Sequence, residues 1–232
     1  MNSVLGELGD PPADTVACFH IADYGQRVWL RPRSRDVAAF DFIAKQHHLP
    51  PDIDPPMEHM AVFGANIGLL LIDLAARYPQ ARLLGVEPDR HNAAVARRNL
   101  APLGSRCLFI EAAVWHEAGY LDFSRTRDAW GLNLTENTTP DERDGETRPT
   151  MAIDAAAVLK EFSGGRSVDY LLVNIESAWY ELFQHGEWTR DVRSVVVEIQ
   201  DHYDEAVPLL ESLGYRAQLR RLDWGAFVVG VR

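Results

Sequence analysis

The turn Gly64-Ala65-Asn66-Ile67-Gly68 is the feature of this sequence with the clearest chemical potential. It follows a short apolar run and precedes apolar residues at helical spacing, so we expect it to join a buried strand to a helix. Glycine lets the backbone turn tightly and approach a ligand closely. The helix behind the turn offers unpaired amide N–H groups and a positive dipole end, which favour a ligand with a carboxylate or phosphate. A plain tight turn is the alternative.

An acid, Glu87, ends the next apolar run about 20 residues beyond this turn, the separation at which a ribose-binding acid follows a glycine turn. Pro88 comes directly after it and stops the strand. A carboxylate at this place can accept hydrogen bonds from both hydroxyls of a ribose. The turn, the helix and the acid therefore predict a nucleoside-binding site. The alternative for Glu87 is a solvated charge at a strand end.

The spacing of the glycines distinguishes between the motifs that bind two nucleoside cofactors, NAD and S-adenosylmethionine. The dinucleotide fingerprint is G-x-G-x-x-G, in which the second glycine permits close approach of the pyrophosphate. Asn66 stands at the place of that glycine here. The pattern therefore favours S-adenosylmethionine, with a nicotinamide-dependent oxidoreductase as a rival.

Strand and helix patterns alternate from Met60 onward, which predicts an α/β fold whose mostly parallel sheet has helices on both faces. The expected strands are Met60–Phe63, Leu83–Val86, Cys107–Val114, Val168–Ile175 and Val192–Ile199. The expected helices include His91–Leu100, Ala152–Phe162, Ala178–His185 and Glu205–Leu213. The last two strands, Arg216–Leu222 and Ala226–Val231, are joined by so short a link that they must form an antiparallel hairpin.

The N-terminal part of the chain lacks this alternation of strand and helix patterns, because prolines divide it into short segments. We expect residues 1–58 to form a small N-terminal appendage, with a strand at Val28–Pro32 and a helix at Asp36–His47, ahead of a domain at 59–232. The polar stretch Arg125–Thr150 lacks periodicity and is expected to be a long loop, either a solvated insertion or a lid over a substrate.

Composition narrows the class of protein. The 232 residues are 47% apolar and carry a formal net charge of -11, which argues against binding to nucleic acid or to a membrane surface. Two cysteines cannot build a disulfide framework. We find no apolar run of the roughly 20 residues that a membrane span needs, and no signal-peptide pattern at the start, so a cytoplasmic location is expected.

These motifs, in this order, resemble the FkbM family of S-adenosylmethionine-dependent methyltransferases. The resemblance runs from Val28 to the C-terminus and is carried by Leu30-Arg31-Pro32, Ser34-Arg35-Asp36, Gly64–Gly68, Glu87-Pro88-Asp89, Asn99-Leu100, Ala113-Val114, Ala152-Ile153-Asp154, Val168–Glu181, Val197-Glu198-Ile199 and Gly214-Tyr215. It implies a class I methyltransferase (Rossmann-like) sheet. It also implies methyl transfer, usually to a hydroxyl oxygen of a small natural product or sugar.

The resemblance also implies residue roles. Cofactor binding falls to Gly64, Ala65, Asn66 and Gly68 around the methionine part, Glu87 and Pro88 at the ribose, and Glu111, Ala112 and Ala113 at the adenine. Asn174 ends the fourth strand near the sulfonium. Glu176 and His202 are the candidate general bases, with Glu198 less favoured. No metal is expected, although Asp201, His202 and Glu176 offer an alternative divalent-metal site for a diol.

Several positions depart from the family's pattern. The family usually has Asp at the position of Val62. At the end of the fourth strand it usually has Lys-Ile-Asp-Val-Glu-Gly-Ala-Glu. In this chain the Lys, the Asp, the Gly and the final Glu of that stretch are replaced by Val173, Asn174, Ser177 and Trp179. Either the acceptor contacts have been rebuilt or catalysis is reduced. A relative that binds the cofactor without catalysis, and an N-methyltransferase, are therefore alternatives. A homo-oligomer is compatible with the sequence.

Overall fold

The protein is described by a computed structural model that covers residues 15–32, 34, 36–37, 39, 43, 48–49, 57–126, 132–134, 143–222 and 225–232. Its centre is a seven-stranded sheet in the order β12-β13-β11-β10-β3-β4-β5. The strands are β3 (His59–Phe63), β4 (Arg82–Glu87), β5 (Cys107–Glu111), β10 (Tyr170–Val173), β11 (Ser194–Ile199), β12 (Arg216–Leu222) and β13 (Gly225–Val231). The strands from β11 to β5 run parallel, and β12 and β13 form an antiparallel hairpin against β11. The predicted α/β class is confirmed.

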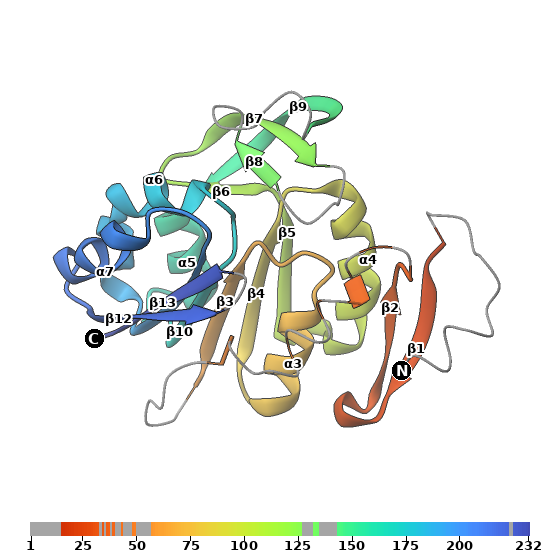
Figure 1. Cartoon of the computed structure of the whole chain (residues 1–232). Helices are drawn as coiled ribbons and strands as arrows, with labels where there is room; N and C mark the ends of the chain where they lie inside the picture. Colours follow the sequence, from red (N-terminus) through yellow and green to blue (C-terminus); the bar gives the residue numbers. More distant parts are fainter. Residues whose placement is uncertain are drawn as a thin grey trace.

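Two helical layers cover this sheet (Figure 1). One layer contains α3 (Leu69–Arg77) and α4 (Arg90–Leu100), and the other contains α5 (Ala155–Ser163), α6 (Ala178–Gln184) and α7 (Tyr203–Ser212). Because side chains alternate along a strand, Ala61 and Phe63 of β3 pack under α5–α7, whereas Met60 and Val62 pack under α3 and α4. Short 3-10 helices lie at Ala22–Tyr24 (η1), Ala101–Arg106 (η2) and Gly186–Asp191 (η4).

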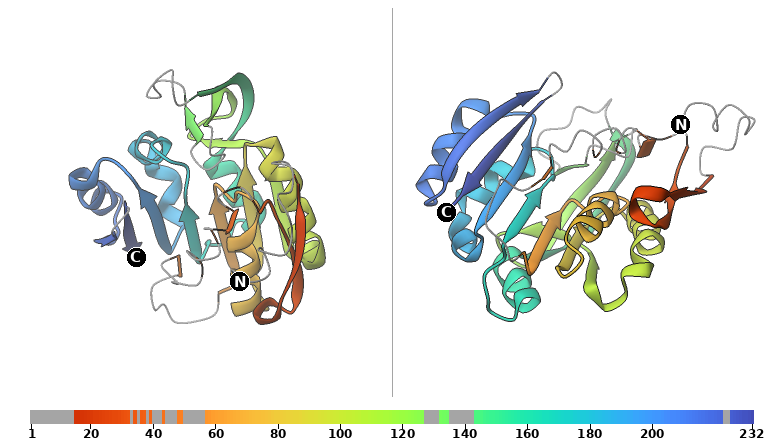
Figure 2. Two further views of the ribbon diagram at one scale, coloured as in Figure 1. Left: turned by 45° about the vertical axis from the view of Figure 1, so that its right-hand side comes forward. Right: turned by 90° about the horizontal axis from the view of Figure 1, so that it is seen from below.

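The front segment contains an antiparallel hairpin of β1 (Ala17–Ile21) and β2 (Gln26–Leu30), which lies beside α4 on the opposite flank from the C-terminus (Figures 1 and 2). The Asn99 side chain on α4 holds this hairpin. Its amide accepts from the Trp29 backbone N–H at 2.6 Å and donates to the Trp29 carbonyl at 3.0 Å. β1 was not predicted. Of the helix predicted at Asp36–His47, residues 36, 37, 39 and 43 are helical and the others lie outside the described residues.

A second sheet of four strands, in the order β6-β9-β7-β8, lies above the carboxyl ends of β4 and β5 (Figure 1). It comprises β6 (Ala113–Trp115), β7 (Gly119–Thr126), β8 (Leu132–Leu134) and β9 (Arg143–Asp154). The single strand predicted at Cys107–Val114 is therefore wrong. It breaks at Ala112, whose N–H donates to the Glu87 carbonyl at 3.1 Å, and the chain then changes sheets.

The loop predicted over Arg125–Thr150 is also wrong where the structure describes it, because Arg143–Thr150 belongs to β9. Its pairing with β7 uses backbone hydrogen bonds, which any residue except proline can donate and every residue can accept, so its polar composition is no obstacle. The helix expected from Ala152 begins at Ala155 instead. Asp154 ends the strand and caps the helix by accepting from the Ala157 N–H at 2.6 Å. Among the described residues, no helix has both the length and the apolar character of a membrane span.

Candidate active site

A cleft of about 680 Å³ lies at the carboxyl ends of β3, β4 and β10, under the second sheet. The cleft is lined by Gly64, Asn66, Val86, Glu87, Pro88, Asn92, Ala112, Ala113, Val114, Phe123, Asn174, Ile175, Glu176 and Ala178. It thus brings together eight residues singled out from the sequence: Gly64, Asn66, Glu87, Pro88, Ala112, Ala113, Asn174 and Glu176.

The glycine turn passes directly over the end of β10. Gly64 has a φ of +79°, and a Cβ atom there would lie 1.7 Å from the carbonyl oxygen of Asn174. Any other residue at this position would therefore push the turn away from β10. Ala65 and Gly68 do not line the cleft: Ala65 is buried behind the turn, and Gly68 caps α3 against Leu100. Their contribution is to the shape of the turn.

Glu87 is the buried charge of the cleft, only 1% exposed. Its Oε2 accepts from the Asn66 N–H at 2.8 Å, and its Oε1 accepts from the Asp89 N–H at 3.0 Å and from Asn92 Nδ2 at 3.4 Å. Burial raises the pKa of Glu87 to about 7, and these donors oppose the rise. A carboxylate has about four acceptor sites, so Glu87 retains capacity for a ligand hydroxyl.

A chain of buried hydrogen bonds links Glu87 to the front segment. The Arg31 guanidinium donates to both Asp36 carboxylate oxygens at 2.8 Å, and its Nη2 also donates to Asn92 Oδ1 at 2.8 Å. This bond fixes the Asn92 amide with its Nδ2 directed at Glu87. Sequence reasoning missed Asn92, although its position in the first turn of α4, shortly after Glu87, is a usable signal.

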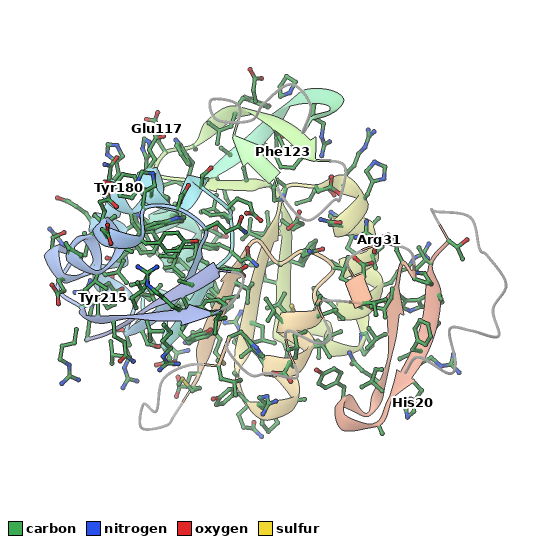
Figure 3. The ribbon with its side chains drawn as sticks, in the orientation of Figure 1. His20, Arg31, Glu117, Phe123, Tyr180 and Tyr215 are labelled. Atoms are coloured by element: carbon green, nitrogen blue, oxygen red, sulfur yellow. The ribbon has the colours of Figure 1, made fainter. Side chains whose placement is uncertain are left out.

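The second sheet supplies the wall of the cleft near Pro88. Phe123 of β7 is buried there (Figure 3), and the Arg148 guanidinium lies over its ring at 5.8 Å. Arg148 also donates to the Pro88 carbonyl at 3.0 Å, which ties β9 to the rim. Glu111 does not line the cleft, because its carboxylate pairs with Arg97 at 2.7 Å outside it.

The predicted catalytic residues separate in space. Asn174 and Glu176 line the cleft, and Glu176 has a φ of +52°, an unfavourable value for a residue with a side chain. His202 does not line it: this exposed side chain stacks on Tyr180 with ring centroids 3.8 Å apart, at the start of α7. Asp201 accepts from Trp179 Nε1 at 3.0 Å. Within the described ranges, no three His, Cys, Asp or Glu side chains form a metal-binding group.

A second cavity of about 400 Å³ lies on the other side of the glycine turn. It shares Gly64, Asn66 and Asn174 with the cleft and is also lined by Ala39, Ile43, Ala65, Ile67, Leu69, Leu70 and Glu198. Glu198 is 5% exposed. Burial and, second, the charge of Glu176 raise the pKa of Glu198 to about 8.

Comparison with protein families now identifies the chain. The model of the methyltransferase FkbM domain matches residues 63–217, more than half of the chain. The chain belongs to the FkbM methyltransferase family. Its reaction class is methyl transfer and its cofactor is S-adenosylmethionine, as predicted. No curated protein matches it.

Three solved structures are similar to this FkbM methyltransferase. TYW2 of M. jannaschii in complex with AdoMet is 12% identical, with 93% of this chain and 85% of that chain covered and a TM-score of 0.49. The precorrin-6y C5,15-methyltransferase of Geobacter metallireducens is 13% identical, with 85% and 88% covered and a TM-score of 0.46. A methyltransferase from Geobacter sulfurreducens is 14% identical, with 84% and 87% covered and a TM-score of 0.45.

The Arg31–Asn92 bond gives the first prediction. The double substitution Arg31→Met/Asp36→Asn removes the donor to Asn92 without leaving an unpaired buried charge. We expect about a tenfold rise in the dissociation constant of S-adenosylhomocysteine, because Asn92 no longer holds its amide toward Glu87. Isothermal titration calorimetry measures this. Arg98→Met is the matched control, since exposed Arg98 contacts Trp29 of the same hairpin by its guanidinium but not Asn92; an equal loss in this control would contradict the prediction.

The buried carboxyl of Glu198 gives a prediction on stability. The pKa of Glu198 is about 8 in the folded protein against an ordinary value of 4.5, so the folded state binds the proton more tightly than the unfolded state. Wild type therefore loses stability as the pH rises from about 4.5 to 8, whereas Glu198→Gln has no such loss. We expect the variant to gain on the order of a few kcal/mol relative to wild type across this window. Urea unfolding at several pH values measures the difference, with exposed Glu211→Gln as control; parallel pH profiles would refute it.

Proposed function

We propose that the chain transfers the methyl group of S-adenosylmethionine to a hydroxyl oxygen of a small natural product or sugar. The observation that supports this is the single cleft in which the glycine turn, the buried Glu87 carboxylate and two polar residues of the β10 end face one another. Ligands of parallel α/β sheets bind at this edge. The resemblance in sequence favours a hydroxyl as the acceptor.

The residues of the cleft fit the cofactor. In our proposal Glu87 accepts from the ribose hydroxyls beside Pro88, and Ala112 and Ala113 face the adenine together with Phe123. Gly64 and Asn66 contact the methionine part, where the missing Cβ of Gly64 leaves room for close backbone approach. Ala65 and Gly68 support the turn from behind. Glu111 has no direct role in this arrangement, because Arg97 holds its carboxylate.

S-adenosylmethionine supplies an electrophilic methyl group when bound. The chain's own residues position the acceptor and handle its proton. In-line positioning of the acceptor oxygen provides much of the rate. We assign proton acceptance to the Glu176 carboxylate, which lines the cleft, and keep His202 as the second candidate. His202 is second because it stacks on Tyr180 and does not line the cleft.

Other features of the proposal rest on the sequence. We propose that the acceptor is a small molecule rather than nucleic acid, because the net charge is -11. As expected from the sequence, we also propose a cytoplasmic location and keep residues 1–58 as an appendage to a domain at 59–232. Nothing in the described residues favours N-methylation over O-methylation.

Cofactor binding tests the core of the proposal. We expect S-adenosylhomocysteine to bind with a dissociation constant in the micromolar range, and Glu87→Ala to weaken it by about 100-fold, since ligand hydroxyls lose a charged acceptor. Glu117→Ala, at an exposed position beyond β6, is the control. Titration calorimetry measures both. If S-adenosylhomocysteine does not bind to wild type, the assignment of the cleft to the cofactor is wrong. If it binds but the protein methylates none of a panel of glycosides and polyketide alcohols, the result favours the alternative of a relative that binds the cofactor without catalysis.

The choice of base has a separate test. If Glu176 accepts the proton, Glu176→Gln lowers kcat by about 100-fold or more while the affinity for S-adenosylhomocysteine stays within about threefold. His202→Ala then has a smaller effect on kcat. Methyl transfer with a radiolabelled donor gives kcat, and exposed His91→Ala is the control for the histidine change. A larger loss in His202→Ala than in Glu176→Gln would reverse the assignment.

A further inference from the structure

We propose that the outer strand β5 is the interface of a homodimer, in which it pairs antiparallel with β5 of a second copy of this chain. β5 and β12 are the two outer strands of the central sheet (Figure 1). An outer strand leaves the N–H and C=O groups of one side without a strand partner, so another strand can bind there. The inference is independent of the proposed function, because no residue of β5 lines the cleft.

The two outer strands differ in charge. β12 carries Arg216, Arg220 and Arg221 among its seven residues, and charged side chains along an edge discourage pairing with another chain. β5 has the sequence Cys-Leu-Phe-Ile-Glu, so its only charge is at its end. That charge, on Glu111, is paired with Arg97 of the same chain at 2.7 Å. β12 is therefore protected against pairing with another strand, and β5 is not.

The side chains of β5 are also less covered than those of the inner strands. Every residue of β3, β10 and β11 is buried, whereas none of the five residues of β5 is. Leu108 is 43% exposed. Ile110 points to the same face of the sheet as Leu108, because side chains alternate along a strand, and it is only partly buried against the core. A further strand beside β5 would cover both side chains.

The direction of the outward backbone groups follows from the hydrogen bond at the end of β5. The Ala112 N–H donates to the Glu87 carbonyl of β4 at 3.1 Å. Successive residues of a strand direct their N–H and C=O groups to opposite sides, so the backbone groups of Phe109 and Glu111 turn away from β4. Among the described residues, β5 has no strand on that side. Phe109 and Glu111 therefore present donors and acceptors to a further strand.

These backbone groups are complementary to the same groups of a second copy. Phe109 is the middle residue of β5, so an antiparallel pair centred on it aligns all five residues of both strands. Phe109 of one copy then exchanges both of its backbone hydrogen bonds with Phe109 of the other. The Glu111 N–H donates to the Cys107 carbonyl of the second copy, which also faces outward, while the Cys107 N–H already donates to the Gly104 carbonyl. Every outward N–H thus meets an outward carbonyl.

The side chains favour the same register. Leu108 lies opposite Ile110 of the second copy, in a pair without backbone hydrogen bonds, where facing side chains are close. The two-fold axis repeats this contact, so both exposed Leu108 side chains are covered. Glu111 lies opposite Cys107, so the Glu111 carboxylates of the two copies do not face each other. Because the strand is complementary to itself in this way, a second copy is favoured over an unrelated strand.

Sedimentation equilibrium of the full chain tests the interface. We expect a monomer–dimer equilibrium between about 1 and 200 µM protein. Salt at about 0.2 M screens the repulsion between two chains of net charge -11. Leu108→Lys should raise the dissociation constant of the dimer by about tenfold or more, because it places a charge against Ile110 of the second copy. Tyr120→Lys, at a position of β7 that is 78% exposed, is the matched control and should leave the constant unchanged.

A cross-link tests the register. In a Cys18→Ser/Cys107→Ser background, Leu108→Cys/Ile110→Cys places two cysteines directly opposite each other, with Cα atoms about 4.5 Å apart, which a disulfide can span. Leu108→Cys alone leaves the cysteines of the two copies on a diagonal, about 7–8 Å apart. We expect mild oxidation to give a covalent dimer of the first variant and little of the second, as measured by non-reducing gel electrophoresis.

Four results would each overturn the inference. The first is a wild type that stays monomeric over the whole concentration range. The second is a dimer that Leu108→Lys leaves intact, and the third is an equal weakening by Tyr120→Lys. The fourth is equal cross-linking of the two cysteine variants. Because none of these measurements uses the cofactor, they leave the proposed function untouched.

Discussion

The burial of the Glu87 carboxylate is the constraint on which the site depends. A carboxylate that is 1% exposed is tolerated only where donors surround it, and here the donors come from the glycine turn, from Asp89 and from Asn92. The turn must therefore come within hydrogen-bond distance of β4. The pKa of Glu87, raised to about 7, shows that the donors offset the cost of burial only in part. A ligand that donates further hydrogen bonds supplies what the protein leaves missing.

The same constraint reaches into the front segment. Arg31 and Asp36 form a bidentate buried ion pair, and the guanidinium has one more donor directed at Asn92. Asn99 holds the β1–β2 hairpin against α4 by hydrogen bonds to the Trp29 backbone. These two anchors make the hairpin part of the structural support of Glu87. The motif around Arg31 in the sequence is thus explained by its contact with Asn92 rather than by contact with the cleft.

Much of the fold could be predicted because its strands are buried on both faces and appear as continuous apolar runs, such as Met60–Phe63. The second sheet could not, because β9 is polar and its pairing depends on backbone groups of a distant strand. The site divides in a similar way. Gly64 and Glu87 could be placed in the site from strand ends alone. Glu111 was expected at the adenine, but it is the last residue of β5 before the chain changes sheets at Ala112, and its carboxylate pairs with Arg97 outside the cleft. Asn92 has a sequence signal in its place shortly after Glu87, and Glu198 was a less favoured candidate base, but only the packing shows that Asn92 contacts Glu87 and that Glu198 faces the second cavity.

The distribution of charge around the glycine turn suits a cation that loses its charge during reaction. Glu87 lines the cleft at the end of β4, Glu176 lines it two residues beyond Asn174, and Asn174 itself is neutral. A carboxylate beside a sulfonium stabilises the charged ground state more than a transition state in which that charge is dispersing, and such binding raises affinity without raising the rate. In the proposed binding mode, Glu87 binds the ribose, where the charge does not change. In the same proposed mode, the amide of Asn174 lies near the sulfonium, where the charge does change, so an amide in place of the family's usual acid is compatible with catalysis.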